Sequence, residues 1–152
     1  MKRLLVIAIG AFSAFSSFDS AAQEKLPINP TNYNKAKLFE DVPQKISLRV
    51  DEMEHLFEIE VGRAVTVKFS KDFYLMGTVV STSQDASVRS MVMRATNRQG
   101  AVFTFSKIKD QSGSFVFRGR ILSRDNGDAF EIVNENGQYI LQKKNDHELV
   151  LE

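Results

Sequence analysis

The chain has 152 residues, of which 43% are hydrophobic, and its 20 lysines and arginines nearly balance its 19 aspartates and glutamates. This composition predicts one compact domain and excludes a collagen, a coiled coil or a highly charged disordered chain. Because the sequence holds no cysteine, it also excludes a disulfide framework, a thiol nucleophile, a Cys-based zinc site and an iron–sulfur cluster.

The first 22 residues have the pattern of a signal peptide. Lys2 and Arg3 precede an uncharged apolar run over 4–18, and Ser20-Ala21-Ala22 fits the small-x-small rule of signal peptidase. A membrane anchor is the alternative, but this run is shorter than the roughly 20 residues that a spanning helix needs. We therefore expect residues 1–22 to be cleaved and the protein to be exported, periplasmic or extracellular, without a stable membrane anchor.

Cleavage would remove two basic residues and one acid, which leaves a mature chain with no net charge. A neutral chain argues against nucleic acid or an anionic membrane as the main partner. The sequence carries no indication of the oligomeric state.

Residues 23–44 hold all three prolines and show no sustained hydrophobic period, so we expect an extended N-terminal arm. Apolar and polar residues then alternate over 46–50, which predicts a short strand. Asp51 offers an N-cap with Glu54 three residues later, ahead of apolar residues at helical spacing. One short helix over about 51–60 is expected.

After Gly62, β-branched and aromatic runs are separated by Gly, Asn, Asp and Ser, which is typical of antiparallel strands joined by tight turns. The connections are too short to contain helices. The fold class is therefore mainly all-β: an antiparallel meander forming a sandwich or a partly closed barrel, within a single domain over 45–152. The expected strands are 64–70, 73–82, 87–96, 101–109, 114–123, 129–134 and 138–144. Turns with glycine at positive φ are expected at 97–100, 110–113, 126–127 and 136–137.

Gly77 and Gly119 lie inside strand patterns, where glycine marks a bulge, a bend or a close backbone approach. Their neighbours repeat with the same spacing, and Phe69-Ser70-Lys71 is echoed upstream of the second copy by Phe105-Ser106-Lys107. The repeat suggests a duplicated hairpin, with chance similarity between apolar strands as the alternative. The repeated positions are Phe73, Gly77, Val79 and Ser81, matched by Phe115, Gly119, Ile121 and Ser123.

No catalytic motif is present: the sequence has no Gly-x-Ser-x-Gly elbow, His-Glu-x-x-His, Walker loop or Gly-x-Gly-x-x-Gly. The two histidines, His55 and His147, lack convergent ligand spacing, so we expect no metal site. Asp125 and Asp128 flank Asn126-Gly127 and are expected to form a turn rather than an acid–base pair. We predict a protein that is not an enzyme, with no catalytic residues and no cofactor.

Charge is distributed unevenly along the chain. Residues 87–124 contain eight basic residues and one acid, whereas 40–60 and 125–152 are acidic. Antiparallel pairing could gather the basic side chains into a stripe that binds a partner protein or an acidic polymer. The alternative is a solvated face that pairs with the acidic helix. The candidate binding residues are Arg89, Lys107, Lys109, Arg118 and Arg120.

Twelve phenylalanines without a tryptophan indicate a Phe-filled core rather than a sugar-stacking platform. A lumen for a fatty or aromatic ligand is the alternative. We therefore expect first a non-enzymatic exported β-domain that binds another macromolecule. A carrier of a small apolar ligand in a Phe-lined barrel is the second hypothesis.

Five short stretches carry a resemblance to known proteins: 37–43, 77–79, 117–121, 128–131 and 137–139. Together they resemble small exported proteins of Bacteroidetes-type bacteria that have no assigned activity. The Gly-x-Val, Gly-x-Ile and Gly-x-Tyr strands over 73–144 are similar, more loosely, to β-rich propeptide regions of secreted metallopeptidases. No protease domain follows in this sequence, so the second resemblance implies action in trans, as an inhibitor or a folding partner.

Overall fold

The computed structural model describes residues 35–123 and 125–145. The predicted signal peptide, the arm as far as residue 34 and His147 lie outside the described residues. Within the described ranges, no helix combines the length and the apolar character needed to cross a membrane.

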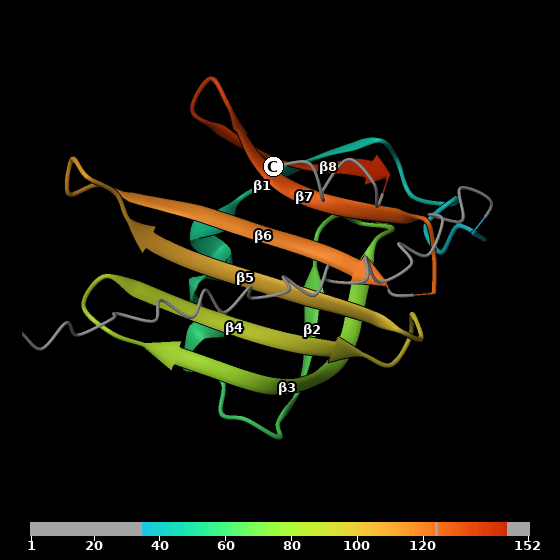
Figure 1. The fold of residues 1–152 in the computed structure, drawn as a ribbon, viewed down its shortest axis with the longest axis horizontal. Coiled ribbons are helices and arrows are strands. Elements are labelled where there is room, and N and C mark those ends of the chain that lie inside the picture. Colours follow the sequence, from blue (N-terminus) through green and yellow to red (C-terminus); the bar gives the residue numbers. More distant parts are fainter. Residues whose placement is uncertain (1–34, 124, 146–152) are drawn as a thin grey trace, which may run out of the picture. The chain divides into compact units, whose positions relative to one another are not determined.

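One antiparallel sheet of eight strands makes up the domain, and it curls into an open barrel (Figure 1). The strand order is β1-β8-β7-β6-β5-β4-β3-β2, so every neighbouring pair except β1 and β8 is consecutive in the chain. This confirms the antiparallel meander and, of the two predicted architectures, the partly closed barrel. The elements are β1 (Lys45–Leu48), η1 (Val50–Glu58), β2 (Ala64–Lys68), β3 (Tyr74–Gln84), β4 (Val88–Ala95), β5 (Ala101–Lys109), β6 (Phe115–Ser123), β7 (Asp128–Glu135) and β8 (Gln138–Asn145).

Apolar and polar side chains alternate along the strands, so one face of the sheet is apolar. This inner face is covered by η1. Phe103 and Phe105 of β5 are fully buried there. Phe57 of η1 stacks on Phe105, with ring centroids 5.0 Å apart, and Phe117 of β6 stacks on Phe105 at 5.7 Å. The predicted Phe-filled core is therefore confirmed, because the aromatic rings pack against one another.

The short helix is a 3-10 helix, and it begins earlier than predicted. Its buried residues Val50, Met53 and Leu56 recur every third position, which matches the three residues per turn of a 3-10 helix. Burial of Val50 draws the start of the helix to that residue. The N-cap is Arg49, which makes no side-chain cap bond, so the predicted Asp51 cap is wrong.

The two edges of the sheet are the short strands β1 and β2. Together with η1 they line an open cleft of about 610 Å³, which we call the seam cleft. Basic side chains, Lys68 and Lys71 among them, surround an apolar floor that includes Leu48, Leu56 and Phe69.

Three of the four turns have the expected left-handed glycine: Gly100, Gly113 and Gly137. Asn136 also has a positive φ of 54°, so Asn136 and Gly137 form the type of turn that suits a two-residue hairpin. Gly127 is different, because its φ is not positive. A Cβ at Gly127 would lie 3.2 Å from the Lys35 Cβ, so this glycine allows the N-terminal segment to pack closely against the turn.

Gly77 and Gly119 permit close backbone approach, as predicted. A Cβ at Gly77 would lie 2.2 Å from the Arg94 carbonyl oxygen, and one at Gly119 would lie 2.7 Å from the Thr104 carbonyl oxygen. The duplication is not supported by the register of the two hairpins. The Phe69 N–H donates to the Phe73 carbonyl, whereas its supposed counterpart Phe105 lies opposite Gly119.

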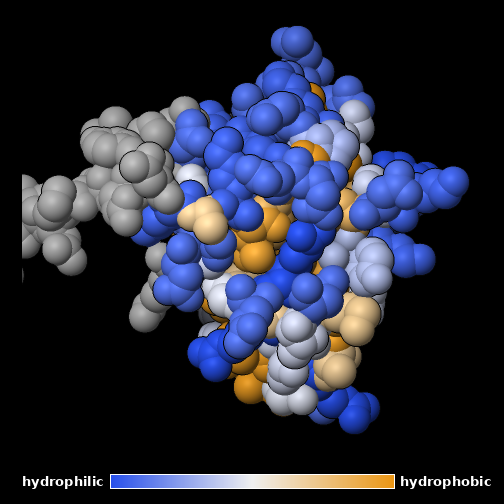
Figure 2. All heavy atoms as spheres, turned by 90° about the vertical axis from the view of Figure 1, so that its right-hand side faces the viewer, coloured by the Kyte–Doolittle hydropathy of each residue, from blue (hydrophilic) through white to orange (hydrophobic). Residues whose placement is uncertain are grey.

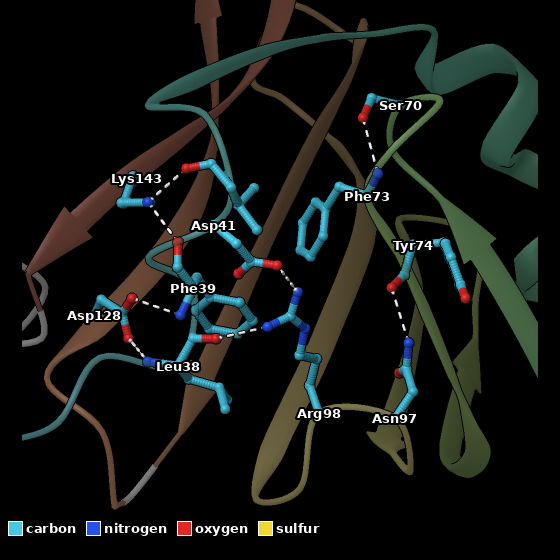
Figure 3. A network of polar contacts seen from close by, with 11 residues as sticks. Leu38, Phe39, Asp41, Ser70, Phe73, Tyr74, Asn97, Arg98, Asp128 and Lys143 are labelled. Atoms are coloured by element: carbon cyan, nitrogen blue, oxygen red, sulfur yellow. Dashed lines mark hydrogen bonds and ion pairs between the residues drawn. The ribbon is translucent and has the colours of Figure 1, made fainter.

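The segment 35–44 packs into the domain, although the sequence predicts it as the end of an extended arm. Phe39 is fully buried and Val42 is nearly so, and both belong to the main core. The buried carboxylate of Asp128 fixes this segment by accepting the backbone N–H groups of Leu38 at 2.7 Å and Phe39 at 2.8 Å (Figure 3). The folded domain thus begins before residue 45, and Asp128 is a buried anchor rather than a turn former.

Two basic side chains complete this network (Figure 3). Lys143 of β8 donates to the carbonyl oxygens of Phe39 and Val42, both at 2.6 Å. Arg98 donates to the Leu38 carbonyl at 2.9 Å and pairs with Asp41 at 2.5 Å. Figure 2 looks at this end of the barrel, where hydrophilic side chains dominate the surface. The segment and its polar contacts therefore cover the aromatic core at this end.

Because of the ion pair between Asp41 and Arg98, we expect the protein to lose a small amount of stability in acid. The hydrogen bond from Arg98 lowers the pKa of Asp41 below its ordinary value. A lowered pKa means that the pair stabilises the fold above about pH 4 and that this contribution disappears as the pH falls through the lowered pKa. Because the Asp41 side chain is 62% exposed, we expect less than about 1 kcal/mol.

The measurement is urea unfolding of the wild type and Asp41→Asn at neutral pH and at a pH below the lowered pKa of Asp41. The two proteins are expected to differ at neutral pH and to converge in acid. The same difference at both pH values would contradict the prediction.

Candidate binding cleft between β6 and β7

Strands β6 and β7 pair over only part of their length. The register contains Gly119 with Ile132, Arg120 with Glu131, and Ile121 with Phe130. β6 begins four residues before this ladder and β7 continues three residues beyond it. The β5–β6 and β7–β8 hairpins diverge past that point (Figure 1).

A cleft of about 580 Å³ lies where the ladder stops, and we call it the β6–β7 cleft. Its lining comes from both faces of the sheet: Arg118 and Val133 point outward, whereas Phe117, Ile132 and Tyr139 belong to the inner face. Thr104 and Ser106 of β5 also line it, so the cleft lies over the outer face of β5 and β6 and enters the sheet between β6 and β7.

Tyr139 of β8 provides a hydrogen-bond partner at the point where β7 leaves β6. Its hydroxyl accepts the Phe117 backbone N–H at 3.1 Å, and its ring meets the Phe117 ring edge-on at 5.6 Å. In a full ladder this N–H would bond to a backbone carbonyl of the neighbouring strand. A side-chain oxygen has replaced a strand here.

The charges in this lining are Arg118, Arg120 and Glu131. Arg120 and Glu131 lie opposite each other and are joined by two hydrogen bonds, at 2.9 and 3.1 Å. Arg118 is exposed and forms no ion pair with the residues that the structure describes. The mouth of the cleft thus carries one surplus positive charge.

The predicted basic stripe does not form, because its members lie on opposite faces of the sheet. Phe105, Lys107 and Lys109 occupy alternate positions of β5, so their side chains lie on the same face of the sheet. Because Phe105 is buried, this is the inner face. On β6 the side chain of Phe117 lies on the inner face. Arg118 and Arg120 are at the intervening positions, so their side chains lie on the outer face.

The inner-face basic residues pair with η1, as the alternative interpretation expected. Lys107 bonds to both carboxylate oxygens of Glu54 at 2.8 Å, and Arg89 pairs with Glu58. The Lys107 ammonium also lies 4.9 Å from the ring centroid of Phe115. These contacts give Arg89 and Lys107 a structural role, while Lys109 lies at the exposed end of β5.

Two members of the cleft lining, Glu131 and Tyr139, were missed by sequence reasoning. Glu131 is recognisable only once the register places it opposite Arg120. Nothing in the sequence marks Tyr139 as the partner of a backbone N–H on another hairpin.

The described residues contain no cluster of three or more His, Asp or Glu side chains that could hold a metal ion. His55 lies on η1, and its Nδ1 is 2.8 Å from the Glu52 carbonyl oxygen.

The fold and the cleft together define an all-β domain: an open eight-stranded barrel with a gap in its sheet. In comparisons with protein-family models, curated proteins and solved structures, none matched the chain. The resemblances to small exported proteins and to metallopeptidase propeptides stay predictions.

Proposed function

We propose that this protein is an exported, non-enzymatic binding domain that captures an acidic segment of another protein in the β6–β7 cleft. The observation that carries the proposal is the position of Arg118, an exposed and locally unpaired guanidinium on the wall of a cleft that enters the sheet. The signal-peptide pattern of residues 1–22 supports the exported location.

An arginine in this position suits a carboxylate partner. Its planar guanidinium can donate two parallel hydrogen bonds to one carboxylate, which adds geometric specificity to the charge attraction. Glu131 already neutralises its neighbour Arg120, so Arg118 is the side chain with capacity for an incoming acid. Among the five predicted binding residues, Arg118 and Arg120 line this cleft.

The carrier hypothesis has less support. A carrier needs an enclosed apolar space of several hundred cubic ångströms. The phenylalanines that would line it contact one another instead: Phe69 meets Phe103 at 5.2 Å between centroids, and Phe73 meets Phe130 at 5.5 Å.

Site-directed photo-crosslinking in the secretory compartment of the source cell tests the proposal. A photoreactive side chain replaces Val116, which lines the cleft, or Val92, a half-buried residue on β4 that does not. We expect a protein adduct at position 116, with acidic residues beside the attachment point, and none at position 92.

Charge reversal supplies the matched control. Arg118→Glu is expected to lower the adduct yield about tenfold, the effect of losing roughly 1.4 kcal/mol of attraction. Arg94→Glu reverses an exposed charge on β4, outside the cleft, and is expected to leave the yield unchanged. Equal adducts at both valines, a glycan adduct, or full yield from Arg118→Glu would each contradict the proposal.

A further inference from the structure

The gap between β6 and β7 also indicates how a partner binds, and this inference rests on the proposed function. We infer that the partner's segment enters as an extended β-strand and pairs its backbone with the open edge of β6, over Phe115–Arg118. Strand addition of this kind uses main-chain hydrogen bonds for affinity and alternate side chains for specificity.

The direction of the backbone groups on β6 supports strand pairing. Successive residues of a strand direct their N–H and C=O groups to opposite neighbours. The Phe117 N–H donates away from β5, to Tyr139, so Phe115 and Phe117 direct their backbone groups toward the cleft. Val116 and Arg118 lie opposite Ile108 and Ser106 of β5 and direct theirs toward that strand.

Tyr139 occupies the place of one missing backbone acceptor. Its hydroxyl satisfies the Phe117 N–H while the cleft is empty of a strand, which avoids an orphaned donor. The backbone of Tyr139 is fixed because this residue pairs with Leu48 on one side and with Asn134 on the other. When a strand enters the cleft, only the Tyr139 side chain therefore has to move. An incoming peptide carbonyl would take over the Phe117 N–H.

The two faces of the cleft select different side chains from such a strand. In an antiparallel pair, directly opposite residues share a face. A partner residue opposite Arg118 therefore lies on the outer face, where an acid suits it. A residue opposite Phe117 lies on the inner face against Phe117 and Ile132, where an apolar side chain suits it. The expected ligand is a segment of alternating acidic and apolar residues.

The test uses the mature chain, residues 23–152, and a capped hexapeptide, Val-Glu-Val-Glu-Val-Glu. In the inferred pairing the valine N–H groups point at β6 and the glutamate N–H groups point away. N-methylation of the valines is expected to weaken binding about tenfold or more, while N-methylation of the glutamates is the matched control and keeps most of the affinity. Calorimetric titration gives the affinities, and the Phe117 amide resonance reports the location.

Two variants separate charge from backbone pairing. Arg118→Glu is expected to weaken the unmodified peptide. Tyr139→Phe is expected to strengthen it by several-fold, because the competing hydrogen bond to the Phe117 N–H is gone. A purely structural tyrosine would leave the peptide affinity unchanged once the thermal midpoint confirms that the variant is folded.

The outcomes distinguish the two levels of the proposal. If N-methylated valines bind as well as the unmodified peptide, strand addition is wrong and capture by charge survives. If the peptide fails to bind, both strand addition and capture by charge are wrong. Both are also wrong if the peptide shifts the amide resonances around Lys68 and Lys71 in the seam cleft instead of that of Phe117.

Discussion

Replacing Asp128 with alanine is expected to lower the free energy of unfolding by about 3–5 kcal/mol. The carboxylate is 2% exposed and accepts two backbone N–H groups, those of Leu38 and Phe39. Alanine would leave both donors without an acceptor at a buried position, and each loses a charge-assisted hydrogen bond. It would also release Phe39, whose ring packs edge-on against Phe130 at 5.4 Å.

Guanidinium unfolding followed by far-ultraviolet circular dichroism measures this loss. Asp125→Ala is the control, because that neighbouring acid is exposed and is expected to change stability by less than about 0.5 kcal/mol. Asp128→Asn should fall between the two, since an amide keeps one acceptor oxygen and offers a donor where the other stood. Equal stability of the two alanine variants would show that segment 35–44 is held by other contacts.

Gly77→Ala is expected to lower the free energy of unfolding by about 3 kcal/mol or to prevent folding. The added Cβ would lie 2.2 Å from the Arg94 carbonyl oxygen and 2.9 Å from its carbonyl carbon. Both are backbone atoms, so no side-chain rotation relieves the overlap and the β3–β4 ladder itself must shift. Ser83→Ala on the same strand is exposed and is expected to be nearly neutral.

Comparison with Gly119→Ala sharpens this prediction. One of the two closest atoms there is the Cδ1 of Ile132, at 2.8 Å, which can change rotamer. Thermal unfolding is therefore expected to place Gly119→Ala between Ser83→Ala and Gly77→Ala. A Gly77→Ala protein as stable as the wild type would mean that the two strands separate at low cost.

The strands could be predicted well because their signals are local. The alternation of apolar and polar residues, together with the turn residues, placed the strand over 101–109 with no error and the seven others with small errors at their ends. The face on which each basic side chain lies could also be predicted from the sequence. Lys107 and Lys109 are at the same alternate positions as the apolar Phe105, whereas Arg118 is at the position between Phe117 and Gly119. Combining them into one stripe overlooked this difference.

The contacts that could not be predicted join residues far apart in the sequence. Asp128 and Leu38 are 90 positions apart, and Tyr139 and Phe117 are 22 apart on different hairpins. A single acid or tyrosine carries no sign of its partner until the register of the whole sheet is known. The short β6–β7 ladder is hidden for the same reason, because both strands look complete in the sequence.

The meandering strand order has a consequence for when folding can finish. The strands from β2 to β8 pair with neighbours in the chain and can form as each hairpin is completed. β1 has only the last strand as its neighbour, and segment 35–44 is also joined to that strand, since Lys143 bonds to Phe39 across 104 positions. During synthesis from the N-terminus, β1 thus has no strand to pair with until β8 has emerged. Pairing of β1 with β8 is therefore the event that marks a finished barrel.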